Sequence, residues 1–267
     1  MINANNTDRT KLASLFEGIG DSMVIAYMQG YMGTCYVDKL PDEGDGAGDG
    51  GPNYGIIVSG EYSFFGGNAE MAEPLLANLF DYIEGDKSTA IYADLSWRDA
   101  LLKYPQNHPE EVMRYGIVQK DYNFDENLLT KLSQNLPAGY ELKLFDEDLY
   151  KQSLEAEWSI EFVEGFESAD DFLSRGFGVA IVKDGELMAG GATQTVYDGG
   201  AETQIATRAD QRGQGLAKAV SAAFVLEGQH RGIRICWDAA NKTSLHIAQT
   251  LGYERDDDYS TVHLSRY

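Results

Sequence analysis

The sequence predicts an α/β (α+β) fold. The main domain is expected to have a mixed, mostly antiparallel sheet flanked by helices, and a smaller N-terminal α/β domain is expected to precede it. Short apolar runs alternate with polar residues and are joined by tight turns such as Asp184-Gly185, a pattern typical of antiparallel hairpins. A helix with a clear apolar stripe comes next, and another alternating run follows it, as in a crossover connection. The polar segment 123–139 predicts a linker. We therefore expect two domains, 1–130 and 131–267.

The second half is the more regular part of the chain. Apolar residues at helical spacing predict helices, and strict alternation predicts strands. The expected strands are 140–144, 177–183, 186–196, 202–207, 233–237 and 259–264, and the expected helices are 149–166, 169–174, one from Leu216, and one capped by Asn241 and ended by Gly252.

The first half is harder to interpret. The expected elements are helices over 21–32 and 69–84, a strand from Cys35, a hairpin over 55–65 and a strand over 89–93. Residues 46–51 match Gly-x-Gly-x-x-Gly, but a proline and a strand follow them rather than a helix, so we predict no dinucleotide site there. A Gly-Gly pair ends one hairpin in each half, and we interpret this as coincidence rather than duplication.

Composition and charge exclude several classes of function. The chain has 267 residues, 43% of them apolar, and a net charge of −22, which indicates an acidic globular protein. Nucleic-acid binding requires clustered lysine and arginine, so we expect no nucleic-acid partner. We also expect no membrane span and no signal peptide. Because Cys35 and Cys236 are the only cysteines, we expect a cytoplasmic protein. The four histidines lack metal-ligand spacing, so we expect no metal.

The most informative segment is the loop between the strand ending at Thr207 and the helix beginning at Leu216. It contains Arg212, Gly213 and Gly215. The first amides of a helix have no intrahelical acceptor and carry partial positive charge, so they form a site for a phosphate. Glycine lets the backbone approach such an anion closely. The loop therefore predicts a site for a cofactor that carries a pyrophosphate.

Two patterns in this half match one known family. Residues 212–217, Arg-Gly-Gln-Gly-Leu-Ala, fit Arg/Gln-x-x-Gly-x-Gly/Ala, and Asn241-x-x-Ser244 is followed at the expected distance by Leu-Gly-Tyr at 251–253. In both patterns residues 138–267 resemble the GNAT superfamily of N-acetyltransferases. Trp237-Asp238 before Asn241 is most similar to the zwittermicin-resistance-type branch. The resemblance implies a GNAT sheet and acetyl-CoA as the acyl donor.

The resemblance also implies roles for individual residues. The backbone of Ile205, Ala206 and Thr207 would bind the pantetheine arm of the cofactor. Asn241 and Ser244 would meet the far side of that arm, although an asparagine at a helix N-cap needs no ligand to explain it. The pyrophosphate would be held by the N–H groups of Arg212, Gly213, Gln214, Gly215, Leu216 and Ala217.

Acetyl transfer to an amine needs a base for the ammonium proton and an acid for the departing thiolate. Glu202, on the strand that leads to the loop, is our candidate base, acting directly or through water, and a plain sheet-edge carboxylate is the alternative. The family's usual acid is a tyrosine, and its position here is Ala248. Tyr253 and Tyr259 are less suitable substitutes, so the acid is not assigned.

These observations predict an acetyl-CoA-dependent N-acetyltransferase whose acceptor is a small-molecule amine that attacks the thioester directly. The N-terminal domain is expected to shape the acceptor site, and the protein is expected to be a monomer or a homodimer. Two alternatives stay open. One is a catalytically silent acyl-CoA-binding or interaction module, which the alanine at 248 favours. The other is a tandem-GNAT aminoacyl transferase, which requires the first half to be a degenerate copy of the second.

Overall fold

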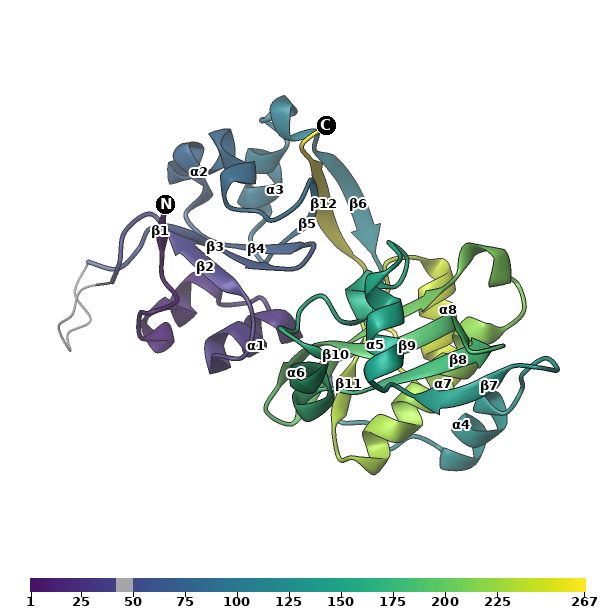
Figure 1. Ribbon diagram of the computed structural model, residues 1–267. Coiled ribbons are helices and arrows are strands. Elements are labelled where there is room, and N and C mark those ends of the chain that lie inside the picture. The colour runs from purple at the N-terminus through teal and green to yellow at the C-terminus, as the bar shows by residue number, and fades with distance from the viewer. Residues whose placement is uncertain (42–49) are drawn as a thin grey trace. The chain divides into compact units, whose positions relative to one another are not determined.

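The protein folds into two compact units, residues 1–113 with 259–267 (unit 1) and residues 114–258 (unit 2). The structure, a computed structural model, describes residues 1–41 and 50–267 (Figure 1), so most of the glycine motif at 46–51 lies outside the described residues. The division comes before the segment that we interpreted as a linker, and the last strand of the chain belongs to unit 1 rather than to the second domain.

Unit 1 contains a seven-stranded sheet in which the C-terminal strand lies between two strands of the first half (Figure 1). Val262 of this strand is buried and pairs with Ala90 in an antiparallel ladder. The alternation at 259–264 correctly predicts a strand, but it does not say which sheet the strand completes. In spatial order the strands are β1 (Ile2–Asn3), β2 (Thr34–Val37), β3 (Tyr54–Ser59), β4 (Tyr62–Gly67), β5 (Lys87–Tyr92), β12 (Tyr259–Ser265) and β6 (Glu110–Arg114).

The helices of unit 1 are short. The expected helix over 69–84 is in fact three pieces, because Asn68 caps the first turn and Pro74 starts a new one. The helix over 95–101 was not predicted; Asp94 caps it and Trp97 is buried in the core. The set is η1 (Arg9–Phe16), α1 (Ser22–Gln29), η2 (Ala69–Met71), α2 (Glu73–Ala77), η3 (Leu79–Asp81), α3 (Leu95–Leu101) and η4 (Pro105–Asn107).

Unit 2 contains a five-stranded sheet with β11 at one edge. The Asp184-Gly185 hairpin is confirmed, and both residues have positive φ, 53° and 85°, as a type I′ turn requires. At the β11 edge, β10 and β11 pair in parallel, with Gly200 opposite Arg234 and Glu202 opposite Cys236. In spatial order the strands are β11 (Arg234–Cys236), β10 (Gly200–Thr207), β9 (Glu186–Tyr197), β8 (Gly178–Lys183) and β7 (Glu141–Leu144).

Two of our helix expectations for unit 2 were wrong. The expected linker carries a helix capped by Asp125, whose Leu129 is buried. The helix expected over 149–166 ends at Leu154. The ring of Phe162 packs directly on Gly190 of the sheet, so closely that a Cβ on Gly190 would lie 2.7 Å from that ring. The helices are α4 (Glu126–Ser133), α5 (Glu147–Leu154), η5 (Ile160–Phe162), α6 (Ala169–Arg175), η6 (Ala209–Gln211), α7 (Leu216–His230) and α8 (Lys242–Leu251).

The two units share an order of elements. In each, three antiparallel strands are followed by helical residues and then by a strand parallel to the third, β4 with β5 in unit 1 and β10 with β11 in unit 2. This shared topology favours a duplicated fold over our interpretation of coincidence. The likeness lies in the order and direction of the strands, and the sequences of the two halves show no clear repeat.

Within 1–41 and 50–267, no helix is both long and apolar enough to cross a membrane. Both cysteines carry free thiols and are buried, Cys35 in unit 1 and Cys236 in unit 2.

Candidate functional site

The loop before α7 has the geometry that the sequence predicts. Gly213 and Gly215 both have φ of +81°, and a Cβ at either position would meet no atom within 4 Å. Gly215 is the N-cap of α7, and no side chain caps this helix. The backbone of this loop is therefore open to a ligand, at the end of a helix of 15 residues whose amide dipoles favour an anion.

The amides at the start of α7 are available for a ligand. The first N–H groups of α7, those of Leu216 and Ala217, have no intrahelical acceptor because of their place in the helix, and no side chain caps this helix. The N–H of Arg212 differs, because it donates to the carbonyl of Ala209 at 3.4 Å and so closes the turn of η6. The Arg212 side chain is exposed, and its Nε donates to the carbonyl of Thr207 at 3.3 Å.

Strand β10 has a free edge beyond Glu202. It pairs with β9 along its whole length, but with β11 only from Gly200 to Glu202, and a bulge interrupts the β9 ladder between Glu202 and Thr203. Residues 203–207 therefore have no strand partner on one side, and the Thr207 carbonyl instead accepts from the Arg212 Nε at 3.3 Å. The hydroxyls of Thr203 and Thr207 are buried and lack a hydrogen-bond partner among the described residues. The free edge, which includes Ile205 and Ala206, thus fits a ligand arm added like a further strand.

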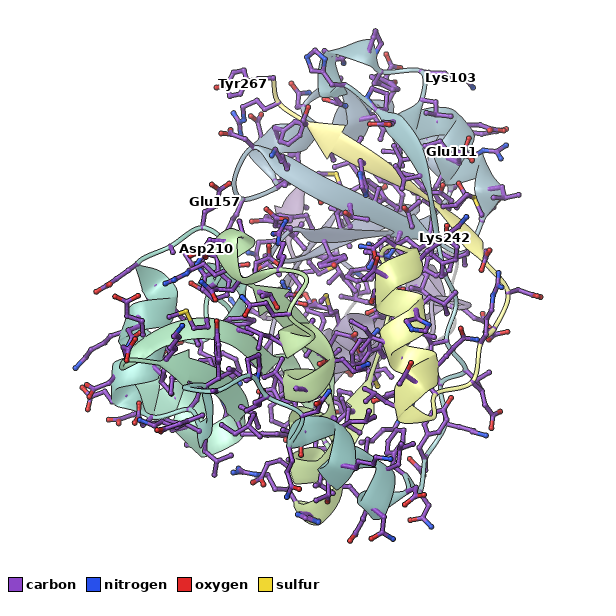
Figure 2. All side chains as sticks on the ribbon, turned by 90° about the vertical axis from the view of Figure 1, so that its right-hand side faces the viewer. Lys103, Glu111, Glu157, Asp210, Lys242 and Tyr267 are labelled. Atoms are coloured by element: carbon purple, nitrogen blue, oxygen red, sulfur yellow. The ribbon has the colours of Figure 1, made fainter. Side chains whose placement is uncertain are left out.

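Asn241 and Ser244 have structural partners. The Asn241 side chain caps α8 by accepting from the Ser244 N–H at 2.9 Å. The Ser244 hydroxyl oxygen accepts from the indole N–H of Trp237 at 3.0 Å. Figure 2 labels Asp210, in the loop before α7, and Lys242, at the start of α8. The Asn241 amide N–H groups and the Ser244 O–H still have donor capacity, so a ligand contact would come in addition to the cap.

Glu202 lies at the point where β10 and β11 separate. Its residue is 8% exposed, and parallel pairing places its side chain on the same face as those of Arg234 and Cys236. Glu202 is therefore not the plain surface carboxylate that we considered as the alternative. A buried carboxylate at the closed end of the free edge is positioned to meet the end of a molecule that lies along residues 203–207.

Two polar groups beside Glu202 were not predicted from the sequence. The Tyr197 hydroxyl and the Cys236 thiol are 3.1 Å apart. Burial, with a further contribution from the Glu202 carboxylate, raises the pKa of Cys236 to about 11, and burial also raises the pKa of Tyr197. The turn Asp198-Gly199, which folds Tyr197 back over Gly200, is the one signal in the sequence that could have placed these residues together.

Position 248, where the family usually has the tyrosine that acts as the acid, has an alanine here. Ala248 is fully buried on α8. Tyr253 is buried as well, and its hydroxyl donates to the carbonyl of Ile235 at 3.0 Å. Burial raises the pKa of Tyr253 well above the usual value. Tyr259 belongs to unit 1. Tyr253 is therefore engaged with the backbone and lacks the geometry to replace the missing tyrosine.

The buried thiols lead to a testable expectation for cysteine modification. The pKa of Cys35 is raised to about 12 by burial and that of Cys236 to about 11, so both thiols stay protonated at neutral pH. At pH 8 the thiolate fraction at Cys236 is then roughly 0.1%. We expect no alkylation of the folded protein by iodoacetamide at pH 8 and two modified residues after denaturation, measured by intact mass. Rapid modification of the folded protein would contradict this arrangement.

A buried ion pair anchors the segment between β11 and α8. The Arg114 guanidinium, 6% exposed, lies 2.6 Å from the Asp238 carboxylate. Removing one partner of such a pair leaves a buried charge and costs about 3–5 kcal/mol. We expect Asp238→Ala to lower the free energy of unfolding by that amount in a urea titration. Asp258→Ala, which breaks an exposed pair with Arg255, should cost less than about 1 kcal/mol, and equal losses in the two variants would contradict this role.

Arg208, beside the loop, is already partnered. Arg208 pairs with Glu186 at 3.0 Å and with Asp210 at 2.8 Å. Among residues 1–41 and 50–267, no group of three or more His, Cys, Asp or Glu side chains could hold a metal ion.

Comparison with known proteins connects this geometry to one group. A family model described as GNAT acetyltransferase matches residues 13–262, so the match extends well into the first half, beyond the region in which we noted a resemblance. The uncharacterized N-acetyltransferase YdfB of Bacillus subtilis (strain 168) is 26% identical over 207 residues, which cover 76% of this chain and 77% of that protein.

Solved structures of GNAT proteins are similar to this chain in fold. A GCN5-related N-acetyltransferase-like protein from Streptococcus suis 89/1591 is similar with a TM-score of 0.82 and 28% identity, over 97% of this chain and 99% of that chain. A tandem GNAT protein from the clavulanic acid biosynthesis pathway has a TM-score of 0.55 and 12% identity, over 98% and 96% of the two chains. At that identity the second likeness concerns the fold alone.

Proposed function

The chain belongs to the GNAT acetyltransferase family, and from that premise we propose that it transfers the acetyl group of acetyl-CoA to the amine of a small molecule. The observation that carries the proposal is the open loop of residues 213–217, with the first amides of α7, which no side chain caps, at its end. Those amides would hold the pyrophosphate, and the free edge at 203–207 would hold the pantetheine arm. Bound there, acetyl-CoA would supply the thioester.

In the proposed reaction, the amine nitrogen forms a bond to the thioester carbonyl carbon and the carbon–sulfur bond breaks. The amine loses one proton and the departing thiolate gains one, so an amide and a thiol result. Glu202 would accept the amine proton, because it is buried at the closed end of the free edge. Much of the rate would come from holding amine and thioester together, since proximity can remove roughly 7–11 kcal/mol from a barrier.

Several finer points belong to the same proposal. The similarity of Trp237-Asp238 and Asn241 to the zwittermicin-resistance-type branch supports a small-molecule acceptor rather than a protein. We place the protein in the cytoplasm, which the burial of both free thiols supports. The protein would act as a monomer or a homodimer.

One observation favours a second candidate. The parallel β4–β5 pair of unit 1 repeats the β10–β11 pair of unit 2, and this is the duplication that a tandem-GNAT aminoacyl transferase requires. The segment after β4 nevertheless carries Glu70 and Glu73 rather than arginine, and these carboxylates would repel a pyrophosphate. The duplicated fold therefore supports one cofactor site, in unit 2.

The proposal is tested by two measurements on the full chain. Calorimetry with acetyl-CoA should show saturable binding, and a thiol-release assay with a panel of small amines should show turnover. Binding without turnover of any amine would favour the catalytically silent module. Turnover of an aminoacyl donor but not of acetyl-CoA would favour the tandem aminoacyl transferase. The absence of acetyl-CoA binding would overturn the proposal.

A further inference from the structure

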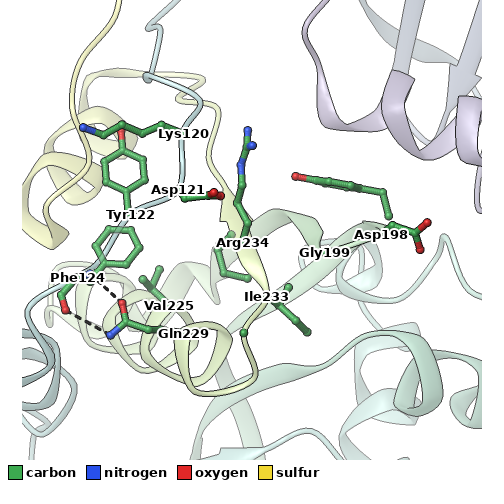
Figure 3. Close-up of a pocket in the computed structure, with 13 residues that line it drawn as sticks. Lys120, Asp121, Tyr122, Phe124, Asp198, Gly199, Val225, Gln229, Ile233 and Arg234 are labelled. Carbon is green, nitrogen blue, oxygen red and sulfur yellow. Dashed lines mark hydrogen bonds between the residues drawn. The ribbon is translucent and has the colours of Figure 1, made fainter.

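Unit 2 contains a cavity that lies far from the loop of residues 213–217. It has a volume of about 530 Å³ and is formed along the edge strand β11, the turn before β10, the C-terminal part of α7 and the segment 120–124 (Figure 3). Since α7 has 15 residues at about 1.5 Å each, Val225 and Gln229, which line the cavity, are most of a helix length from Gly215. The cavity is therefore not part of the pyrophosphate loop.

The walls of the cavity are built to hold a molecule with both apolar and charged parts. Tyr122 and Phe124 lie on one side with stacked rings, 5.1 Å apart and inclined by 14°. Phe124 is held in place by two backbone hydrogen bonds with the Gln229 side chain, at 2.8 and 3.3 Å (Figure 3). These contacts make this wall a rigid apolar surface suited to a carbon skeleton.

The guanidinium of Arg234 is satisfied only in part, because it interacts with Cys236 and Asp121 but not through its Nε. Its Nε is buried and has no hydrogen-bond partner among the described residues. Its guanidinium extends into the cavity beside Asp121, whereas the Lys120 ammonium points away (Figure 3) and binds Glu254 at 2.5 Å. A buried guanidinium donor without an acceptor is costly, so a ligand with an acceptor oxygen would stabilise this site.

The charge balance selects the kind of anion. Arg234 and Lys120 contribute two positive charges to the lining and Asp121 and Asp198 two negative ones, and Lys120 is already paired. A dianionic phosphate would face two carboxylates and a single guanidinium that already lies beside Asp121 and Cys236. A single carboxylate matches one guanidinium, which binds it through two parallel hydrogen bonds.

Arg234 is also close to the candidate base. Arg234 and Cys236 lie on one face of β11, opposite Gly200 and Glu202, and residues two apart on a strand are about 6.5–7 Å apart. A molecule whose carboxylate binds Arg234 can therefore present an amine toward Glu202, while the acyl donor approaches Glu202 from the other end of β10, along residues 203–207. The two reactants would enter from opposite ends of the strand.

We propose that this cavity binds the acceptor, and that Arg234 pairs with a carboxylate carried by the same molecule as the reacting amine. The acceptor is then an amino acid or a related amino carboxylate. This inference rests on the proposed acetyl transfer for its chemistry, but the binding step can be measured without it.

The binding test follows the Nε–H signal of Arg234 in the full-length protein by nitrogen-15 NMR, assigned by its loss in Arg234→Lys. The probes are linear amino acids from glycine to aminohexanoate, each paired with the alkylamine that lacks its carboxylate. We expect a saturable shift with at least one amino acid and none with its matched amine. Equal shifts with both members of every pair, or no shift with any probe, would overturn the proposal.

The kinetic test uses the same probes with acetyl-CoA. We expect Arg234→Gln to raise KM for the preferred amino acid by about 10- to 100-fold, the loss expected for a charged hydrogen-bonded pair, with acetyl-CoA affinity unchanged. Arg255→Gln removes the same charge from the exposed pair with Asp258 and should leave KM unchanged.

The outcomes separate the two proposals. A shift without turnover would keep the carboxylate site and reject acetyl transfer. Turnover of alkylamines as efficient as that of amino acids, or an unchanged KM in Arg234→Gln, would keep acetyl transfer and reject the carboxylate site.

Discussion

Gly215→Glu is expected to weaken acetyl-CoA binding by at least about 100-fold. The residue has φ of +81°, a conformation that costs a non-glycine residue about 1–2 kcal/mol. The added carboxylate would lie at the N-cap of α7, where the pyrophosphate is expected, and would repel it at short range in a place that bulk salt screens little. Calorimetry with acetyl-CoA measures the effect directly.

Gly185→Glu is the matched control for this variant. Gly185 has φ of +85° and open space around its missing Cβ, so the same substitution introduces the same charge and the same backbone strain at the β8–β9 turn. We expect this variant to lose a similar amount of stability and to bind acetyl-CoA like the wild type. Equal affinity in the Gly215 variant and in the control would show that the loop does not hold the cofactor.

Glu202→Gln is expected to lower kcat by about 10²- to 10⁴-fold, the usual contribution of a positioned base. The substitution keeps the shape of the side chain and its place opposite Cys236 but removes its capacity to accept a proton. Cofactor affinity should change by less than about twofold, because the free edge and the loop at 213–217 are unaltered. Steady-state kinetics with a substrate amine, together with calorimetry, separate these two effects.

The pH dependence supplies a second readout for Glu202. A carboxyl group accepts a proton only when ionised, so the wild-type rate should fall as the pH drops through the pKa of this base. In Glu202→Gln the rate should instead follow the free-amine fraction and rise with pH until the amine itself has lost its proton. Glu141→Gln, on the exposed surface of β7, should keep the wild-type profile. A wild-type profile in Glu202→Gln would exclude Glu202 as the base.

Local patterns account for much of what could be predicted about unit 2. The turn at Asp184-Gly185, the stripe of α7 and the caps at Asn241 and Gly252 depend on residues close in sequence. The loop with Gly213 and Gly215 belongs to the same class, because a left-handed glycine and an uncapped helix start are local features. These elements were correctly predicted for that reason.

Elements that depend on packing were not predictable in the same way. The helix after Asp146 ends at Leu154, and the chain beyond it packs the Phe162 ring on the sheet at Gly190. The polar segment over 123–139 forms α4 because Leu129 is buried, although propensity alone favours a linker there. Such outcomes are decided by contacts between residues far apart in the chain, which override local propensity.

The sequence by itself determined the glycine loop before α7, the order of strands in unit 2, and the absence of a tyrosine at position 248. Only the tertiary structure decided that the final strand completes the sheet of unit 1, that Glu202 is buried opposite Cys236, and that Arg234 lines a cavity with its Nε unpaired. The physical reason is the same in each case. Periodicity fixes which face of a strand is apolar, but strand pairing, which is set by the packing of the whole unit, decides which side chains share that face.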